Sequence, residues 1–192
     1  MSTDSSVVGY LTPAVSPAPL QDIALANFFQ EWVVGITGLT NVNVRPRWQH
    51  EAPNIPVEGT DWAAIGIVKR ETQKYAAEVH KSTSGGFNEI RNHETLHILA
   101  SFYGDNADNY ASLLREGMSL AQNREILFTN NMGLVDWGDI ITAPELFKER
   151  WLYRVDFDFS VRRQIVRDYS VSNLASGNAN LNNSKYQEPI NV

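Results

Sequence analysis

The stretch RVDFDFSVR, residues 154–162, is the segment that decides how this chain folds. Within it, apolar side chains alternate strictly with polar ones: Val155, Phe157, Phe159 and Val161 against Asp156, Asp158, Ser160 and Arg162. Successive side chains of a β-strand point to opposite faces, so a period of two places all the apolar residues on one side. The pattern predicts a strand with one buried face and one charged face.

Other segments have strand patterns too. Residues 62–68 are apolar on both faces, as in a central strand, and residues 75–80 alternate. We expect residues 75–80 to be half-buried and to form a hairpin with the first of these strands. Residues 90–102 alternate again and predict a long strand. Pro46 makes the short strand at residues 42–48 a candidate edge strand, because proline cannot donate a ladder hydrogen bond.

Two segments predict helices. Apolar residues recur at three- and four-residue steps over residues 20–39, and Gly38 marks the end of that helix. Asp105 or Asp108 is expected to cap a second helix that runs to about Gln122. Strands and helices do not alternate regularly along the chain. We therefore predict an α+β fold with a largely antiparallel sheet flanked by two main helices.

The two ends of the chain differ in composition from its middle. Residues 1–19 contain Pro13, Pro17 and Pro19, which oppose a persistent helix or paired strand, so we expect an extended N-terminal arm. Residues 170–192 are rich in Asn and Ser and predict a flexible C-terminal arm. A single α+β domain is expected between them, at residues 20–169.

Composition excludes several classes of function. A net charge of −6 opposes a protein that grips nucleic acid over its whole surface. Long apolar runs and a signal peptide are not apparent, so we expect no membrane contact and synthesis in the cytosol. The chain has 0 cysteines, which excludes disulfides, thiol nucleophiles and thiolate metal sites. Any catalytic metal would depend on histidines and carboxylates.

The segment His93-Glu94-Thr95-Leu96-His97 has the H-E-x-x-H spacing of zinc metalloproteases. On a helix the two histidines would stand about 6 Å apart along the axis and could share a metal ion. On a strand they would lie about 13 Å apart and could not. The surrounding alternation favours a solvent-facing strand. A zinc metallohydrolase is therefore a remote alternative, and we expect no metal.

Other enzyme signals are weak. Asp156 and Asp158 share one strand face, but Arg154 and Arg162 flank them and favour a solvated charged surface over a catalytic pair. The sequence has no G-x-S-x-G elbow to activate a serine. We expect no catalytic residue and no cofactor.

The chain offers better candidates for a protein interface. Trp48 and Trp151 lie beside charged residues near strand ends, where large amphipathic rings often anchor subunit contacts. Between the predicted strands, we expect residues 50–59, which include His50, Pro53 and Pro56, to form an exposed loop. We predict that these five residues belong to an interface, although partial burial in the core would also explain the tryptophans.

Several linked segments resemble a known family: LTNVNVRPRWQHEAPNIPVEGTDWAAIGI, HETLHILASFYG, YASLLREGMSLAQNREIL and ITAPELFKERWLYRVDFDFSVRRQI. Together they cover about residues 20–168 and are similar to the neck terminators of contractile-tailed bacteriophages. The resemblance implies a tail-terminator-like α+β subunit without catalytic residues, in which HETLH is part of a strand. It also implies a virion protein of the neck.

In that family the subunits form a ring, usually a hexamer, that caps the tail tube. The resemblance implies contacts with tube and sheath proteins and with the head connector, and a lumen through which DNA passes without specific binding. The two arms leave open a collar or adaptor protein of the same head–tail junction. A binding module of another assembly is a further alternative, and it would be monomeric or dimeric when isolated.

Overall fold

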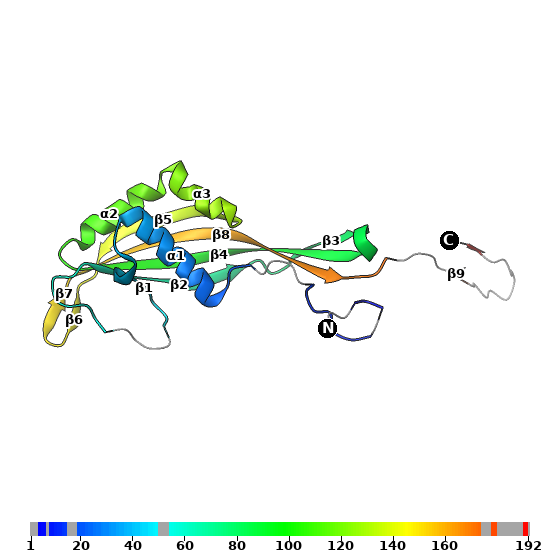
Figure 1. The fold of residues 1–192 in the computed structure, drawn as a ribbon, viewed down its shortest axis with the longest axis horizontal. Helices are drawn as coiled ribbons and strands as arrows, with labels where there is room; N and C mark the ends of the chain where they lie inside the picture. The colour runs from blue at the N-terminus through cyan, green and yellow to red at the C-terminus, as the bar shows by residue number, and fades with distance from the viewer. Residues whose placement is uncertain are drawn as a thin grey trace. The chain divides into compact units, whose positions relative to one another are not determined.

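The computed structural model describes residues 4–6, 8–14, 19–49, 54–173, 178–179 and 190–191. Figure 1 shows its elements, which follow one another in this order: α1 (Asp22–Thr37), η1 (Asn41–Asn43), β1 (Val44–Pro46), β2 (Trp62–Thr72), β3 (Ala77–Lys81), η2 (Thr83–Gly85), β4 (Phe87–Tyr103), α2 (Ala107–Met118), α3 (Ala121–Thr129), β5 (Met132–Thr142), β6 (Glu145–Phe147), β7 (Arg150–Leu152), β8 (Arg154–Ser170), β9 (Asn178–Ala179) and β10 (Ile190–Asn191).

Most strands belong to one six-stranded sheet with the order β1-β2-β4-β8-β5, in which β3 also pairs with β4. β1 runs parallel to β2 and forms one edge, as Pro46 predicted. The pairs β2–β4, β3–β4 and β5–β8 are antiparallel. β6 pairs with β7 and β9 with β10, each as a separate antiparallel pair. The predicted α+β class with a largely antiparallel sheet is therefore confirmed.

The chain divides into two compact units. The first consists of Met1–Ala18, Ala77–Arg91 and Val166–Val192, and the second of Pro19–Ala76 and Asn92–Ile165. Single-domain folding of residues 20–169 stays a prediction. Much of the two predicted arms, residues 1–19 and 170–192, lies outside the described residues.

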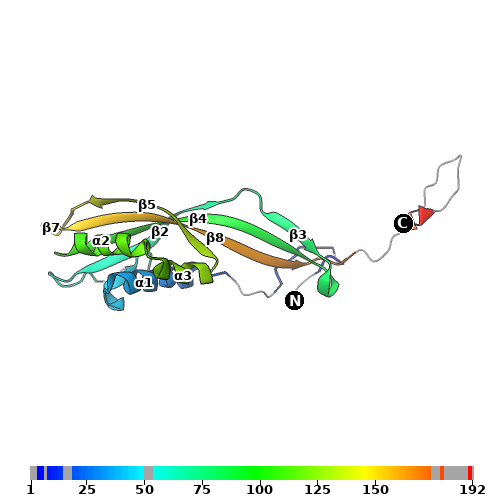
Figure 2. The same ribbon diagram turned by 90° about the horizontal axis from the view of Figure 1, so that it is seen from above.

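The second unit contains the hydrophobic core. In Figures 1 and 2 its three helices lie on one face of the sheet, and the core fills the space between them. The four apolar residues of the RVDFDFSVR stretch point into this core and are buried, while Asp158 and Arg162 on the alternate face are exposed. Helix α1 contributes buried residues such as Phe29 and Trp32. The strict alternation of β8 was thus a correct guide to which face is buried.

The first unit contains described parts of both chain ends. The Ala14 N–H donates to the carbonyl of Asp168 at 2.7 Å, next to a bridge between residues 13 and 169. The Asn173 side-chain amide donates to the carbonyl of Ser82 at 2.9 Å, and its backbone N–H donates to the carbonyl of Gly85. Residues just beyond β8 are therefore hydrogen-bonded to the turn between β3 and β4.

One strand pairing was predicted wrongly. β3 pairs with β4, Ala77 opposite Arg91, and does not form a hairpin with β2. The short turn of residues 82–86 brings β3 against β4, and its backbone takes left-handed φ angles at Ser84, Gly85 and Gly86. The strand is also exposed along almost its whole length, where a half-buried strand was predicted.

The second predicted helix is two helices. α2 ends at Met118, Leu120 takes an extended conformation, and α3 begins at Ala121, so a third helix was missed. Neither Asp105 nor Asp108 caps α2. The Asn106 N–H at its start instead donates to the carboxylate of Asp61 at 3.0 Å, 45 residues earlier in the chain.

Candidate interface surface

Trp48 lies just after the edge strand β1, and its side chain is 73% exposed. Its indole N–H donates to the carbonyl of Ile67 in β2 at 3.4 Å, so the ring lies against β2 just beyond the end of β1. Together with the first turns of α1, it borders a cavity of about 570 Å³ whose floor includes Ile65 and Gly66. An exposed indole beside an apolar cavity is typical of an interface anchor.

Gly66 allows Trp48 to take this position. A Cβ atom at residue 66 would lie 2.8 Å from the Cβ of Arg47 and 3.3 Å from the Nε1 of Trp48. The φ angle of Gly66 does not lie in the left-handed region, so backbone conformation is not the reason for a glycine here. The reason is the close approach of the Trp48 segment. The role of Gly66 was not identified from the sequence, although a glycine inside an otherwise apolar strand is a known signal that another backbone segment approaches closely.

Trp151 lies on the β6–β7 hairpin and is 72% exposed. It pairs across the hairpin with Leu146, which is also exposed, and the two form one apolar pair. The turn is made by Lys148 and Glu149, both with left-handed φ angles of 47° and 63°. Such a two-residue turn twists in the sense that antiparallel strands require. The hairpin therefore presents an aromatic and aliphatic surface on a short, defined scaffold.

A second cavity of about 790 Å³ lies beside this hairpin. Trp151 and Phe147 line it from the hairpin, and Ile55 and Pro56 line it from the loop before β2. An ion pair between Arg150 and Glu58 joins the same two segments. The structure thus brings two of the predicted interface residues, Pro56 and Trp151, to one cavity.

The remaining predicted residues have different outcomes. Trp48 borders the first cavity and is absent from the lining of the second. His50 and Pro53 lie outside the described residues. Among the described residues, the predicted interface residues thus lie at two separate surfaces, one with Trp48 and one with Pro56 and Trp151. That either surface binds a partner stays a prediction.

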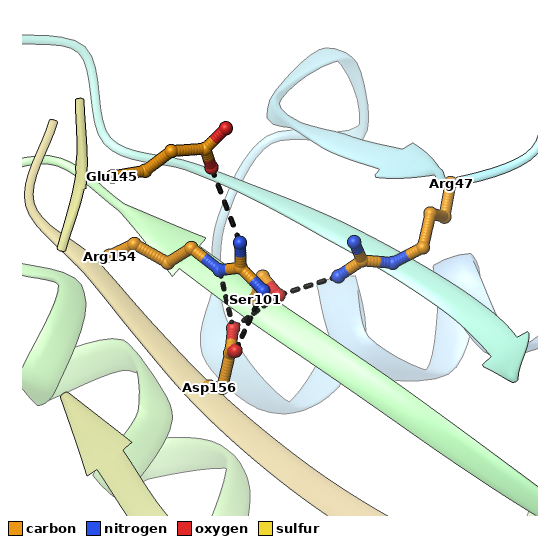
Figure 3. A network of polar contacts seen from close by, with 5 residues as sticks. All are labelled: Arg47, Ser101, Glu145, Arg154 and Asp156. Carbon is orange, nitrogen blue, oxygen red and sulfur yellow. Dashed lines mark hydrogen bonds and ion pairs between the residues drawn. The ribbon is translucent and has the colours of Figure 1, made fainter. Parts of the chain in front are cut away.

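A polar network on the helix-free face of the sheet holds the bases of both surfaces (Figure 3). The Arg47 guanidinium donates to the Ser101 hydroxyl at 2.5 Å, and this hydroxyl donates to the Asp156 carboxylate at 2.5 Å. Arg154 donates to both oxygens of Asp156, at 2.8 and 2.7 Å, and to Glu145 at 3.2 Å. Arg47 precedes Trp48, and Glu145 begins the hairpin, so the network links the two surfaces.

The network is well shielded from water at its centre. Ser101 is 0% exposed, and the two planar hydrogen bonds from Arg154 to Asp156 make a bidentate pair. Hydrogen bonds to Asp156 raise the pKa of the Arg154 guanidinium, which therefore stays charged. Next to it, Tyr103 stacks on Trp62 with ring centres 4.0 Å apart, and burial raises the pKa of the Tyr103 hydroxyl. These contacts favour a rigid base.

The HETLH segment is part of β4, as predicted, and not of a helix. The expectation of a solvent-facing strand is wrong for Glu94, which is 6% exposed and points to the helix side with Leu96. Its carboxylate pairs with Arg163, which is 2% exposed and also donates to the Leu20 carbonyl just before α1. The motif's glutamate therefore anchors α1 to the sheet. Among the described residues, no group of three or more histidine and acidic side chains is placed to hold a metal ion.

A second set of polar residues includes a serine, a histidine and an acid. His97 lies 3.0 Å from the Ser160 hydroxyl through Nδ1 and 3.4 Å from the Glu71 carboxylate through Nε2. These residue types occur in hydrolytic triads, but here they project from β2, β4 and β8, which are neighbours in one sheet. Backbone amides in paired strands are committed to ladder bonds and cannot stabilise an oxyanion. The arrangement is that of a cross-strand polar cluster.

Two comparisons with known proteins bear on the family of this chain. The sequence profile of a family described as "Phage neck terminator protein" matches residues 24–184, most of the chain. A search of curated proteins gives no match. Within the part of the chain that the structure describes, no helix is long and apolar enough to cross a membrane.

Proposed function

Because this chain belongs to the phage neck terminator protein family, we propose that it forms a ring that caps the tail tube and joins it to the head connector. The observation that carries the proposal is the family match over residues 24–184, which includes the core and both exposed surfaces. Membership makes the chain a structural protein of the bacteriophage neck, present in the virion and associated with other head and tail proteins. This is not a class of enzyme.

The arrangement of exposed aromatic residues supports the ring. A closed ring needs heterologous contacts, in which one patch of a subunit meets a different patch of its neighbour. The second unit has two such patches, one at Trp48 and one at Trp151, and they are built on different elements. We propose six subunits, the usual number that the family resemblance implies. Interfaces concentrate their binding energy in buried aromatic anchors, which suits both tryptophans.

The charge of the chain supports a role as a conduit. A net charge of −6 gives a ring without a general excess of positive groups, so DNA passing through its lumen would not be held by its phosphates. We propose that the ring contacts the tail tube on one side and connector proteins on the other. We also propose that the ring contacts a contractile sheath and that the protein is synthesised in the host cytoplasm.

The function is tested by deleting the gene from the phage that encodes it and examining lysates by negative-stain electron microscopy. We expect tail tubes of uncontrolled length, and full heads that are not joined to tails. Complementation by the wild-type gene should restore both features. Tails of normal length that lack only the joined head would favour a collar or adaptor, and normal joined virions would contradict a neck function.

A further inference from the structure

We propose that the β6–β7 hairpin of one subunit inserts into the α1–β2 cavity of the next subunit, and that this contact closes the ring. The inference rests on the proposed function and identifies the two patches that meet. It follows from three features of the second unit: the shape of the hairpin, the lining of the cavity and the charges that each carries.

The hairpin has the properties of an inserted element. Leu146 and Trp151 form an exposed apolar pair on it, with 61% and 72% of their surfaces accessible. An isolated two-stranded hairpin is marginally stable in water, yet this one is held at its base. The Ala143 N–H donates to the Arg154 carbonyl at 2.9 Å, and the Arg154 side chain bonds Glu145. A fixed base reduces the entropy lost when the tip is bound.

The cavity has the properties of a receptor. Its volume is about 570 Å³, and it is lined by Ile23 and Ala26 of α1, Ile65 and Ile67 of β2, and the indole of Trp48. Ile23 is 77% exposed, although α1 buries its other face in the core. An apolar cavity rimmed by exposed apolar side chains is a common feature of sites that receive an aromatic or aliphatic anchor.

The charges of the two patches are complementary. The hairpin turn carries Lys148 and Glu149 next to each other. Of the charged residues that line the cavity, Asp22 of α1 and Arg70 of β2 are exposed, whereas Arg47 is bonded within the polar network. Insertion of the hairpin would bring Lys148 toward Asp22 and Glu149 toward Arg70, so that opposite charges meet. Opposite charges across an interface fix orientation and disfavour other partners.

The geometry also decides between a neighbouring copy and the same chain. In Figures 1 and 2 the hairpin lies at one end of the second unit's sheet, away from the first turn of α1. The hairpin is held at its base by the bonds of Arg154, so we assign the contact to neighbouring copies. Different patches meeting between copies give a head-to-tail contact, which generates a ring and not a symmetric dimer.

The proposal is tested by cross-linking, and the chain is suited to it because it has 0 cysteines. Lys148→Cys at the hairpin turn and Asn27→Cys in the cavity lining leave Trp151 and the apolar lining in place. They are made in separate chains, mixed, and treated with a short bis-maleimide. We expect a covalent dimer from the mixture and little from either variant alone. The matched control replaces Asn27→Cys with Gln122→Cys, another exposed polar residue, on α3. This control should give much less dimer with Lys148→Cys, because residue 122 is not in the cavity.

Charge reversal gives a second readout, with ring mass measured by light scattering. Glu149→Arg and Arg70→Glu should each weaken assembly about 10-fold or more, and the double variant should restore it. If the wild-type protein forms a ring, but the Lys148→Cys and Asn27→Cys chains give no preferential cross-link and the double charge variant does not restore assembly, the hairpin contact is overturned and the ring stands. If the wild-type protein forms no ring and the cysteine variants give no cross-link, the proposed ring is overturned as well.

Discussion

The two faces of strand β8 show how one stretch of chain serves two purposes. On the helix side, Val155, Phe157 and their neighbours are buried in the core. On the other side, Asp156 joins the polar network that holds the hairpin and the Trp48 segment. The first face determines whether the subunit folds. The second face determines where its exposed surfaces point, so substitutions on the two faces should have different consequences.

The largest effect is expected on the helix side. Phe157→Asp places a carboxylate in the apolar core and should destabilise the subunit by more than about 4 kcal/mol, enough to unfold it. Circular dichroism and chemical denaturation measure this. Asp158→Asn, the next residue on the exposed face, is the matched control and should change stability by less than about 0.5 kcal/mol. A folded Phe157→Asp protein would mean that the core is misassigned.

The next largest effect concerns the buried ion pair. Glu94→Gln removes the buried carboxylate that pairs with the Arg163 guanidinium and should cost about 3–5 kcal/mol of unfolding free energy. Equilibrium denaturation in urea is the measurement. Glu71→Gln, which breaks an exposed pair with Lys69, is the control and should cost at most about 1 kcal/mol. Equal losses in the two variants would contradict the anchoring role of Glu94.

A smaller effect is expected on the helix-free face. Arg154→Met removes the bonds to Asp156 and Glu145 and should cost about 1–3 kcal/mol. Because Glu145 begins the hairpin, assembly should weaken in conditions where the subunit stays folded. Light scattering beside circular dichroism separates the two effects. Arg162 is exposed on the same face of β8, so the control Arg162→Met should alter neither stability nor assembly. If Arg154→Met assembles as the wild-type protein does, the network does not position the hairpin.

Still smaller is the expected effect of removing both histidines of the HETLH segment. His93→Ala with His97→Ala should change stability by no more than about 1 kcal/mol, because both side chains are only half-buried. Thermal unfolding and light scattering should give a protein of nearly unchanged melting temperature and assembly. If zinc copurified with the wild-type protein, and the double variant lost both the zinc and its fold, the result would contradict this and favour a metal site.

The smallest and most local effect depends on pH. His80 meets two amide oxygens, that of Asn88 at 2.6 Å and that of Asn173 at 2.9 Å, and only the protonated ring can donate to both. These two bonds, with a smaller contribution from Glu78, raise the pKa of His80 above its ordinary value of 6.5. The stabilisation is therefore fully present below pH 6.5 and is lost as the pH rises through the raised pKa.

This pH effect is measurable within the first unit. Titration of the His80 ring by NMR should give a pKa above 6.5. As the pH rises past the pKa of His80, hydrogen exchange of the Asn173 backbone amide should accelerate by more than the intrinsic increase of exchange with pH. His80→Gln should abolish the additional pH dependence. A His80 pKa below 6.5 would show that the ring does not hold residues 171–173 against the turn.

Local patterns were enough to predict much of the fold. The alternation in β8 and the spacing in α1 identified both elements and their buried faces, because each pattern repeats within one element. The partner of β3 and the cap of α2 depend on other segments, so alternation and local capping rules gave the wrong answer. The role of Glu94 depends on Arg163, 69 residues away, and no local spacing specifies such a pair.

The candidate surface was predicted less completely. Trp48 and Trp151 were identified from their charged surroundings, and both are exposed. Their assignment to separate cavities, and the network through Ser101, follow from strand pairing that the sequence does not display. Leu146 and Phe147 were not singled out, because an apolar pair in a short segment could equally be buried.

The proposed ring is tested most directly by the mass of the purified wild-type protein in solution, measured by size-exclusion chromatography with light scattering. We expect a closed assembly with a mass near six times 21.6 kDa that does not grow further with concentration. A protein that stays at 21.6 kDa at every concentration would contradict the ring.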